Sequence, residues 1–202
     1  MDGSISGETA YNTDPYTSGK MGVSLTSVEK LKRAVKMARD NKLQLAVHAM
    51  GDKAIQTVID VTKEIAPWLT TMPSVRIEHA SLMTDQMFAE IANSKMNYAL
   101  VTQPIFFFAE DESYRHYLSP AQFKLAYRVK TMLNSQAMLG LSSDAPCTPW
   151  AEPDSPFYSI YAAVTRKAAD FVILNDDIFT VAHSKLKNIH VNETWMAGKR
   201  VM

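Results

Sequence analysis

The stretch "LQLAVHAMGDKA", residues 43–54, joins a short apolar run that ends on a histidine to a segment of helical periodicity. The apolar run has the length of a strand, and the apolar residues after Gly51, among them Ile55 and Ile59, repeat at helical spacing. This stretch therefore predicts a buried strand that ends on His48 and leads directly into a helix. A lone histidine at such a position is most often a core residue, so a functional role for His48 depends on the rest of the chain.

The same arrangement recurs further along the chain. "SVRIEHA", residues 74–80, predicts a strand that ends on His79, and "AMLGLSSDAP", residues 137–146, predicts one that ends on Asp144. Between them, "MNYALVTQPIF", residues 96–106, predicts a further strand. Helical periodicity separates these strands, and alternating strands and helices are typical of an α/β fold with a parallel sheet.

The spacing of these residues favours one kind of α/β fold. A (β/α)8 barrel uses about 250 residues for eight units, or roughly 31 residues per unit. His48 and His79 are 79 − 48 = 31 residues apart, and His79 and Asp144 are 144 − 79 = 65 apart, about two units. The carboxyl ends of barrel strands meet on one face, so we expect all three residues to converge there. A doubly wound sheet would need a Gly-rich phosphate turn, and the sequence contains no G-x-G-x-x-G.

Two histidines and an aspartate at converging strand ends suit a divalent transition metal, with Zn²⁺ as the first choice, because imidazole nitrogen and carboxylate oxygen are ligands that zinc accepts. Such a metal lowers the pKa of a bound water toward about 7 and polarises a carbonyl group. An aspartate beside that water, here Asp144, can accept its proton and pass it to a leaving group. The sequence thus predicts a metal site formed by His48, His79 and Asp144.

The segments between the strands contain residues that predict helix starts and a loop. A T-x-x-E capping box at residues 26–29 predicts the start of a helix, and Asp52 is the predicted N-cap of the next one. Residues 109–119, "AEDESYRHYLS", are polar and predict a loop. Ser119 with the proline that follows it predicts the start of a helix that continues through Leu133.

Composition excludes several classes of function. The 202 residues contain 21 Lys and Arg and 21 Asp and Glu, so the formal net charge is zero and the basic footprint of a nucleic-acid binder is missing. No apolar run approaches the roughly 20 residues of a membrane-spanning helix. Cys147 is the only cysteine, and residues 1–20 lack the pattern of a signal peptide. We expect a cytoplasmic protein with a small-molecule substrate and neither a nucleic-acid nor a membrane partner.

Several segments together resemble a known family. In chain order they are "MDGSISGETA", "VHAMGDKA", "RIEHASL", "SSDAPCTP", "IYAAVTRK", "ADFVILNDDIF" and "VNETWMAGKRVM". They resemble the C-terminal half of the amidohydrolase superfamily, in the branch that includes the N-substituted formamide deformylases. The likeness covers nearly all of the chain.

The resemblance implies both a fold and a set of site residues. The fold is the C-terminal half of a (β/α)8 TIM barrel of metal-dependent hydrolase type, over residues 1–167, followed by part of a small β-sandwich subdomain, over residues 168–202. His48 and His79 are implied to be metal ligands, and Asp144 is implied to be both a ligand and the catalytic base. The implied reaction is hydrolysis of a C–N bond in an amide, formamide or cyclic amide by metal-activated water.

The chain departs from the family in one important respect. The family has a His-x-His pair on its first strand, and no two of the five histidines here, at positions 48, 79, 116, 183 and 190, are separated by one residue. A half barrel also exposes two sheet edges and the apolar inner face. We therefore expect the chain to need the missing N-terminal half, or an oligomeric partner, to complete the barrel.

Other interpretations remain open at this point. A hydrolase of the same architecture could act on an ester or deaminate its substrate, and the chain could instead be a catalytically inactive remnant or a partner subunit without the His-x-His metal site. His116, in the predicted loop, is a candidate substrate-binding residue, with simple surface exposure as the alternative. Glu78, next to His79 on its strand, is expected to point away from the barrel axis and to pair with Arg76 or with a helix.

Overall fold

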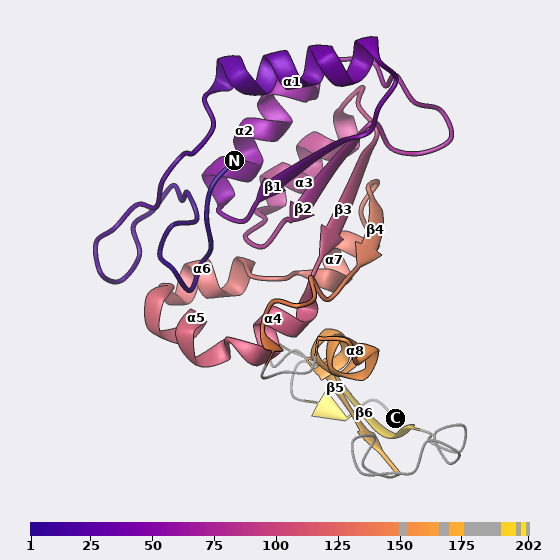
Figure 1. The fold of residues 1–202 in the computed structure, drawn as a ribbon. Helices are drawn as coiled ribbons and strands as arrows, with labels where there is room; N and C mark the ends of the chain where they lie inside the picture. The colour runs from indigo at the N-terminus through magenta and orange to yellow at the C-terminus, as the bar shows by residue number, and fades with distance from the viewer. Residues whose placement is uncertain (150–152, 166–169, 176–190, 197–198, 201–202) are drawn as a thin grey trace. The chain divides into compact units, whose positions relative to one another are not determined.

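The computed structural model describes residues 1–149, 153–165, 170–175, 191–196 and 199–200 (Figure 1). It divides into two compact units, described separately below: Met1–Gln103 with Glu110–Ser142, and Pro104–Ala109 with Ser143–Met202. The helices are α1 (Val28–Asp40), α2 (Asp52–Thr62), α3 (Asp85–Asn93), α4 (Pro104–Ala109), α5 (Asp111–Tyr117), α6 (Pro120–Leu125), α7 (Val129–Leu133) and α8 (Pro156–Thr165). The strands are β1 (Leu45–Ala49), β2 (Val75–His79), β3 (Tyr98–Thr102), β4 (Met138–Leu141), β5 (Asp170–Leu174), β6 (Val191–Met196) and β7 (Lys199–Arg200).

The first unit is built on a parallel sheet with strand order β1-β2-β3-β4. Val47 on β1 lies opposite Ile77 on β2, Ile77 opposite Leu100 on β3, and Leu100 opposite Leu139 on β4. The strands neighbour one another in chain order with helices between them, which is the arrangement of consecutive units in a (β/α)8 barrel. The predicted α/β class with a parallel sheet is confirmed.

Helices α1, α2 and α3 pack against one face of this sheet (Figure 1). Their apolar residues, including Leu31, Ile55 and Phe88, form a single core with Val47 and Ile77 of the strands. Alternation along each strand sends every second side chain into this core, while the others lie on the face without these helices. The core thus fixes which strand residues are available to a site on the opposite face.

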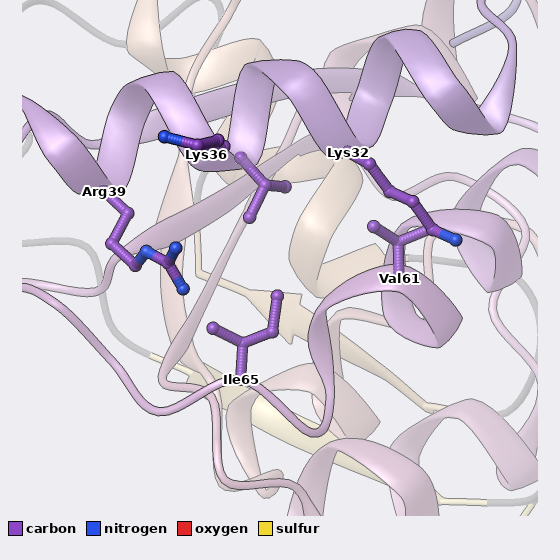
Figure 2. A pocket seen from close by; sticks show the side chains of 6 residues that line it. Lys32, Lys36, Arg39, Val61 and Ile65 are labelled. Carbon is purple, nitrogen blue, oxygen red and sulfur yellow. The ribbon is translucent and has the colours of Figure 1, made fainter.

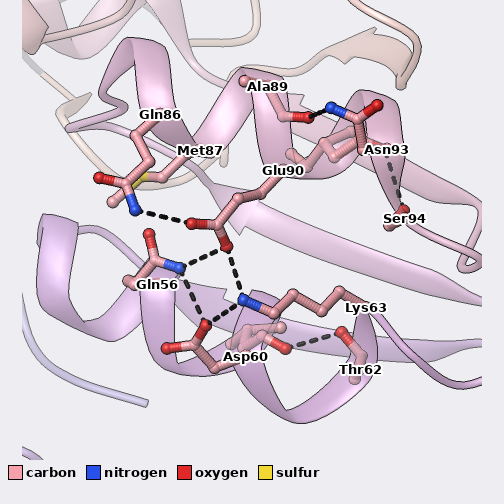
Figure 3. Close-up of polar contacts among 12 residues, drawn as sticks. Gln56, Asp60, Thr62, Lys63, Gln86, Met87, Ala89, Glu90, Asn93 and Ser94 are labelled. Atoms are coloured by element: carbon pink, nitrogen blue, oxygen red, sulfur yellow. Dashed lines mark hydrogen bonds and ion pairs between the residues drawn. The ribbon is translucent and has the colours of Figure 1, made fainter.

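Polar contacts join α2 to α3 on the outside of the core (Figure 3). The Lys63 ammonium, just after α2, donates to the carboxylates of Asp60 at 2.8 Å and Glu90 on α3 at 2.9 Å. Gln56 on α2 donates to the same Glu90 carboxylate at 2.9 Å. The Lys63 hydrogen bond, followed by that from Gln86, lowers the pKa of Glu90 below its ordinary value.

A hollow lies in the helix layer between α1 and α2 (Figure 2). Lys32, Lys36 and Arg39 of α1 surround it, and Val61 and Ile65 contribute apolar surface from α2 and the turn after it. These side chains offer cationic and apolar groups and no metal donor. The hollow is therefore not an alternative metal site.

Two predicted helix starts are shifted by one residue. Ser27 caps α1 and accepts from the backbone N–H of Lys30 at 3.3 Å, so the capping box predicted at residues 26–29 was wrong. Gly51 is the N-cap of α2, and Asp52 is its first helical residue. The Asp52 carboxylate instead accepts from the backbone N–H of Thr13 at 2.8 Å and ties the N-terminal segment to the helix.

The region after β3 is more helical and more broken than predicted. Asp111–Tyr117, predicted as a loop, forms α5. Ser119 does cap a helix through a full capping box, but α6 ends at Leu125 and a separate α7 begins at Val129. The break falls where Tyr127 donates its backbone N–H to the Ser81 carbonyl at 2.8 Å. Contacts with the loop after β2 therefore override the helical period.

The second unit, described by itself, contains α4 packed against α8 and an antiparallel sheet with strand order β5-β6-β7. A bulge interrupts the β5–β6 pairing between Ile173 and Leu174. The predicted domain boundary after Lys167 lies outside the described residues. Among the helices that the structure describes, none is long and apolar enough to cross a membrane.

Candidate metal centre

His48 lies on β1, one residue before the strand ends. Its Cα is in register with Glu78 of β2, whereas Ala49 is in register with His79. The His48 side chain is 40% exposed, but its Nδ1 atom is buried. The exposed surface therefore belongs to other atoms of the side chain.

His79 is the last residue of β2 and is 8% exposed. In a regular parallel pair, its offset from His48 by one register position would send the two rings to opposite faces. His79 and Ala80 instead have left-handed backbone torsions, with φ of 68° and 45°. This turn ends the strand alternation, and the two imidazole centroids lie 4.5 Å apart with their planes at 64°. The structure thus brings His48 and His79 together, as predicted from their spacing.

The sequence analysis assigned no role to Asp2, yet this residue contacts His48. The Asp2 side chain is fully buried, and its Oδ1 lies 3.2 Å from His48 Nδ1. The distance is that of a close polar contact, although the N–H direction is not aligned as a regular hydrogen bond. The two residues are far apart in the chain, and no local sequence pattern signals the contact.

Backbone N–H groups hold the Asp2 carboxylate in place. Oδ1 accepts from Met50 at 3.1 Å, and Oδ2 accepts from Gly51 at 2.8 Å and from Tyr11 at 2.9 Å. Met50 and Gly51 form the turn between β1 and α2, and Tyr11 belongs to the N-terminal segment. Asp2 therefore joins the N-terminal segment to the end of the strand that carries His48.

Glu78 pairs with Arg76, one of the two partners that the sequence predicted, through an ion pair between Oε1 and Nε. Its predicted orientation was wrong. Glu78 is in register with His48, and residues in register on parallel strands share a face of the sheet. Glu78 and Arg76 therefore lie on the same face as His48. The prediction assumed regular alternation up to His79, and the left-handed torsion of His79 removes that residue from the alternation.

Asp144, the third predicted site residue, belongs to the second unit and is described within that unit only. It is exposed, its φ is 56°, and its carbonyl accepts from the backbone N–H of Cys147 at 2.9 Å. It follows β4 in the chain after Ser142 and Ser143. Its assignment as ligand and base remains a prediction.

His116, the candidate substrate-binding residue, is exposed on α5. Its ring contacts that of Tyr117 edge to face at a centroid distance of 4.9 Å, and its carbonyl accepts from the Thr17 hydroxyl at 2.7 Å. These contacts lie on the same helix and on the N-terminal segment. A role in substrate binding remains a prediction.

The residues present fit a divalent metal in part. Two imidazoles from neighbouring strand ends are nitrogen donors of the type that zinc and similar metals accept. Within the described part of the chain, no group of three or more His, Cys, Asp or Glu side chains is placed to hold a metal ion. A metal at this histidine pair would need further ligands.

Comparison with known proteins defines the family. The residue pattern of the amidohydrolase family matches residues 1–169. The chain belongs to the amidohydrolase family. It is 29% identical over 170 residues to a Bacillus subtilis (strain 168) protein named "Putative amidohydrolase YtcJ", and this alignment covers 83% of the chain and 31% of that protein.

Two further similarities point in the same direction. The N-substituted formamide deformylase of Arthrobacter pascens is 25% identical over 158 residues, which cover 78% of the chain and 28% of the deformylase. The crystal structure of an uncharacterized metal-dependent hydrolase from Pyrococcus furiosus superimposes with a TM-score of 0.68 at 32% identity, covering 81% of the chain and 32% of that hydrolase. The chain thus spans about a third of the length of these relatives.

Proposed function

We propose that this chain contributes part of the active site of a metal-dependent hydrolase that cleaves a C–N bond in an amide, formamide or cyclic amide. The observation that carries the proposal is the approach of His48 and His79, whose ring centroids are 4.5 Å apart at neighbouring strand ends. Family membership supports a metal-dependent hydrolase in general, and the likeness to a formamide deformylase favours C–N bonds.

In this proposal His48 and His79 hold a divalent metal, with Zn²⁺ as the expected ion. When bound, such a metal supplies Lewis acidity and lowers the pKa of a coordinated water toward about 7. Asp144 is a further ligand in this proposal and acts as the base. It accepts a proton from the water that attacks the substrate carbonyl carbon, and it then delivers that proton to the nitrogen as the C–N bond breaks.

We also propose that a segment outside these 202 residues completes the barrel, either on the same polypeptide or on a partner. Two observations support this: the chain covers about a third of its relatives, and β1 and β4 are the outermost strands of its parallel sheet. The proposed barrel part ends at about residue 167, with a small β subdomain after it. The added segment would also supply the metal ligands that the histidine pair lacks.

A second candidate is favoured by the small number of metal donors. The described residues bring only the two histidines together as donors, so the chain could be an inactive remnant or a partner subunit. The two candidates differ in metal content.

Elemental analysis of the full-length protein, purified without chelators, decides between them. The hydrolase predicts about one or two divalent metal ions per chain in the wild type and a large loss in the His48→Ala/His79→Ala double variant. His116→Ala is the matched control, because His116 is exposed on α5 and should leave metal content unchanged. Metal content near zero in the wild type would favour the inactive candidate.

A substrate panel then tests the bond type. N-substituted formamides, simple amides and cyclic amides form one arm, and esters and aminated heterocycles form the others. Turnover confined to the ester or deamination arm would keep the metal hydrolase and refute the C–N hydrolysis of amides.

A further inference from the structure

Gln103 and Ser142 form a polar pair just beyond the ends of two neighbouring strands. β3 ends at Thr102 and β4 at Leu141, and the ladder between them ends with the backbone N–H of Ser142, which donates to the Thr102 carbonyl at 3.1 Å. The Gln103 side chain is buried, and its Nε2 donates to the Ser142 hydroxyl oxygen at 2.9 Å. A buried amide thus reaches from the end of one strand to a half-buried serine at the end of the next.

The direction of this hydrogen bond is set by the neighbouring backbone. Gln103 Nε2 also donates to the Val101 carbonyl oxygen at 3.4 Å, and exchange of the two amide atoms would place oxygen against oxygen. The buried Oε1 has no hydrogen-bond partner among the described residues, so the contacts of the nitrogen alone hold the amide.

The contact with Gln103 leaves the hydroxyl hydrogen of Ser142 available. A serine hydroxyl has one hydrogen to donate and two lone pairs that accept. Gln103 donates to one of these lone pairs. Within the described part of the chain, no acceptor binds the hydroxyl hydrogen itself. Ser142 is therefore equipped to donate to a group that comes from outside.

Register places Ser142 on the face of the sheet that carries His48. His48 is in register with Glu78, Glu78 with Val101, and Val101 with Gly140. Side chains two positions apart on a strand lie on the same face, so Ser142, two residues after Gly140, shares the face of His48. This face is opposite the helix layer. In a (β/α)8 barrel it is the inner face, and barrel enzymes bind their substrates at its carboxyl end.

We propose that the Ser142 hydroxyl is a substrate-binding donor, and that Gln103 is a positioning residue that leaves its hydrogen for the carbonyl oxygen of an amide, formamide or cyclic amide. The substrate class rests on the proposed function, whereas the donor role of the hydroxyl rests on its contact with Gln103. A hydroxyl that already accepts one hydrogen bond can donate to an amide oxygen without rearrangement.

The competing explanation is that the pair only holds β4 against β3. Such a role would affect stability and leave the binding of ligands unchanged. Ser142→Ala removes the hydroxyl, and Ser142→Thr keeps it. Ser94→Ala is the matched control, because Ser94 is also half-buried but lies between α3 and the start of β3. Its hydroxyl contacts the backbone carbonyls of Ile91 and Met96, each at 2.9 Å.

The first measurement tests the direction of the hydrogen bond in the metal-free, full-length protein. The NMR signals of the Gln103 side-chain amide are assigned by their loss in Gln103→Ala. We expect one amide hydrogen to move upfield in Ser142→Ala, because it loses its acceptor, and to return toward its wild-type position in Ser142→Thr. Ser94→Ala should leave both amide hydrogens where they are.

The second measurement is the equilibrium affinity of the same metal-free protein for formanilide, acetanilide and oxindole. N-methylaniline, N-ethylaniline and indoline are the counterparts that lack the carbonyl oxygen. One hydrogen bond of this kind changes Kd about 2- to 10-fold, and we expect Ser142→Ala to weaken the three amides by that factor. The counterparts should be unaffected, and Ser142→Thr and Ser94→Ala should bind the amides as the wild type does.

Gln103→Glu tests the positioning role separately. An ionised carboxylate can only accept hydrogen bonds, so the Ser142 hydroxyl would donate to it and its hydrogen would be lost to the ligand. Amide affinity should then fall as in Ser142→Ala, with the hydroxyl still present. If Ser142→Ala does not fold, Ser142→Cys takes its place, because a thiol is a weak donor.

The outcomes separate this proposal from the proposed function. Unchanged Gln103 amide signals in Ser142→Ala overturn the proposal, as does an unchanged affinity for the amides or a wild type that binds none of them. Equal weakening of the amides and their counterparts would reduce the pair to a structural contact. Selective weakening of the amides, in a protein that takes up no divalent metal, would leave the Ser142 donor standing and refute the proposed function.

Discussion

His79 and Asp144, two of the three predicted site residues, have left-handed backbone torsions, with φ of 68° and 56°. A non-glycine residue held in this region costs of the order of 1 kcal/mol or more, and such residues cluster at functional sites. For His79 the consequence is visible, because the torsion turns the ring toward His48. The same torsion occurs at residues outside the site, such as Lys42, so it supports the assignment only together with the ring contact.

The predicted base is tested by Asp144→Asn. The amide keeps an oxygen that can coordinate a metal and removes the basic group, so metal should remain while turnover falls. A general base contributes about 10² to 10⁴ in rate, and kcat should fall by at least the lower figure. Steady-state kinetics of the full-length protein with metal analysis of the same sample measure both. Near-normal kcat with metal bound would remove Asp144 from the role of base.

His48→Ala is expected to act through the metal. Removal of one imidazole should weaken metal binding, and added Zn²⁺ should restore part of the lost activity. No such recovery is expected for Asp144→Asn, because its defect is in proton transfer. A zinc titration of both variants shows the contrast, and equal recovery in both would contradict the separate roles.

At the residue scale, the sequence predicted that His48 and His79 lie together, but it did not predict the contact of Asp2 with His48. His48 and His79 both end apolar runs, and their 31-residue spacing matches one barrel unit. Asp2 lies in a polar segment whose contact with β1 depends on how that segment folds back. The face assigned to Glu78 was wrong because simple alternation cannot foresee the left-handed torsion at His79.

At the scale of the elements, the turn from β1 to α2 packs closely against the N-terminal segment. A Cβ on Gly51 would lie 2.2 Å from the Tyr11 carbonyl oxygen and 2.5 Å from its carbon. Gly51→Ala should therefore push that segment away and destabilise the protein by about 1–3 kcal/mol. Urea unfolding of the full-length protein measures the loss.

Gly140→Ala is the control for this prediction. A Cβ at Gly140, on β4, would have a Val101 methyl group as its nearest neighbour, at 3.2 Å, and this side chain can give way. Its effect should stay below about 1 kcal/mol, since alanine also restricts the unfolded chain. Equal losses in both variants would show that the Tyr11 contact is not the cause.

The contacts between α2 and α3 predict a pH dependence of stability. The Lys63 hydrogen bond holds the pKa of Glu90 below its ordinary value of 4.5 in the folded state. A depressed carboxyl pKa stabilises the fold above the unfolded-state value, and this contribution is lost as the pH falls through the folded value. Glu90→Gln should thus be less stable than the wild type at neutral pH, and the difference should shrink below about pH 4.5.

The measurement is urea unfolding of the full-length protein at a series of pH values, with Glu64→Gln as the control. Glu64 forms an ion pair with Lys95 in which both side chains are largely exposed, and such pairs contribute little. A difference between wild type and Glu90→Gln that stays constant from neutral to acid pH would rule out the ionised Glu90 contact as its source.

Elements that follow local rules were predicted well, and those set by distant contacts were not. Ser119 caps α6 as its sequence indicates. The helix expected to continue through Leu133 breaks because Ala126 forms a β-bridge with Leu82 and Tyr127 donates to Ser81. These contacts join segments far apart in the sequence, so helical periodicity alone cannot reveal them.

For the whole molecule, we expect the outer strands of the parallel sheet to decide whether the chain associates in solution. Unpaired strand edges favour association with other chains, and Met138 and Leu141 on β4 are 60% and 48% exposed. The 202 residues expressed alone should be oligomeric, insoluble or without a cooperative unfolding transition. Co-expression with the segment that completes the barrel should give a defined species. Light scattering and thermal unfolding measure both, and a cooperatively unfolding monomer of the isolated chain would contradict the prediction.

The Asp2 carboxylate also affects hydrogen exchange. It accepts the amide hydrogens of Tyr11, Met50 and Gly51, which come from two separate segments. Amide hydrogens exchange with solvent when local opening breaks their hydrogen bonds. Since one side chain protects all three, lifting of the N-terminal segment should release them together, at a common rate. Their deuterium uptake would then report, without any substrate, how often the contact between Asp2 and His48 is broken.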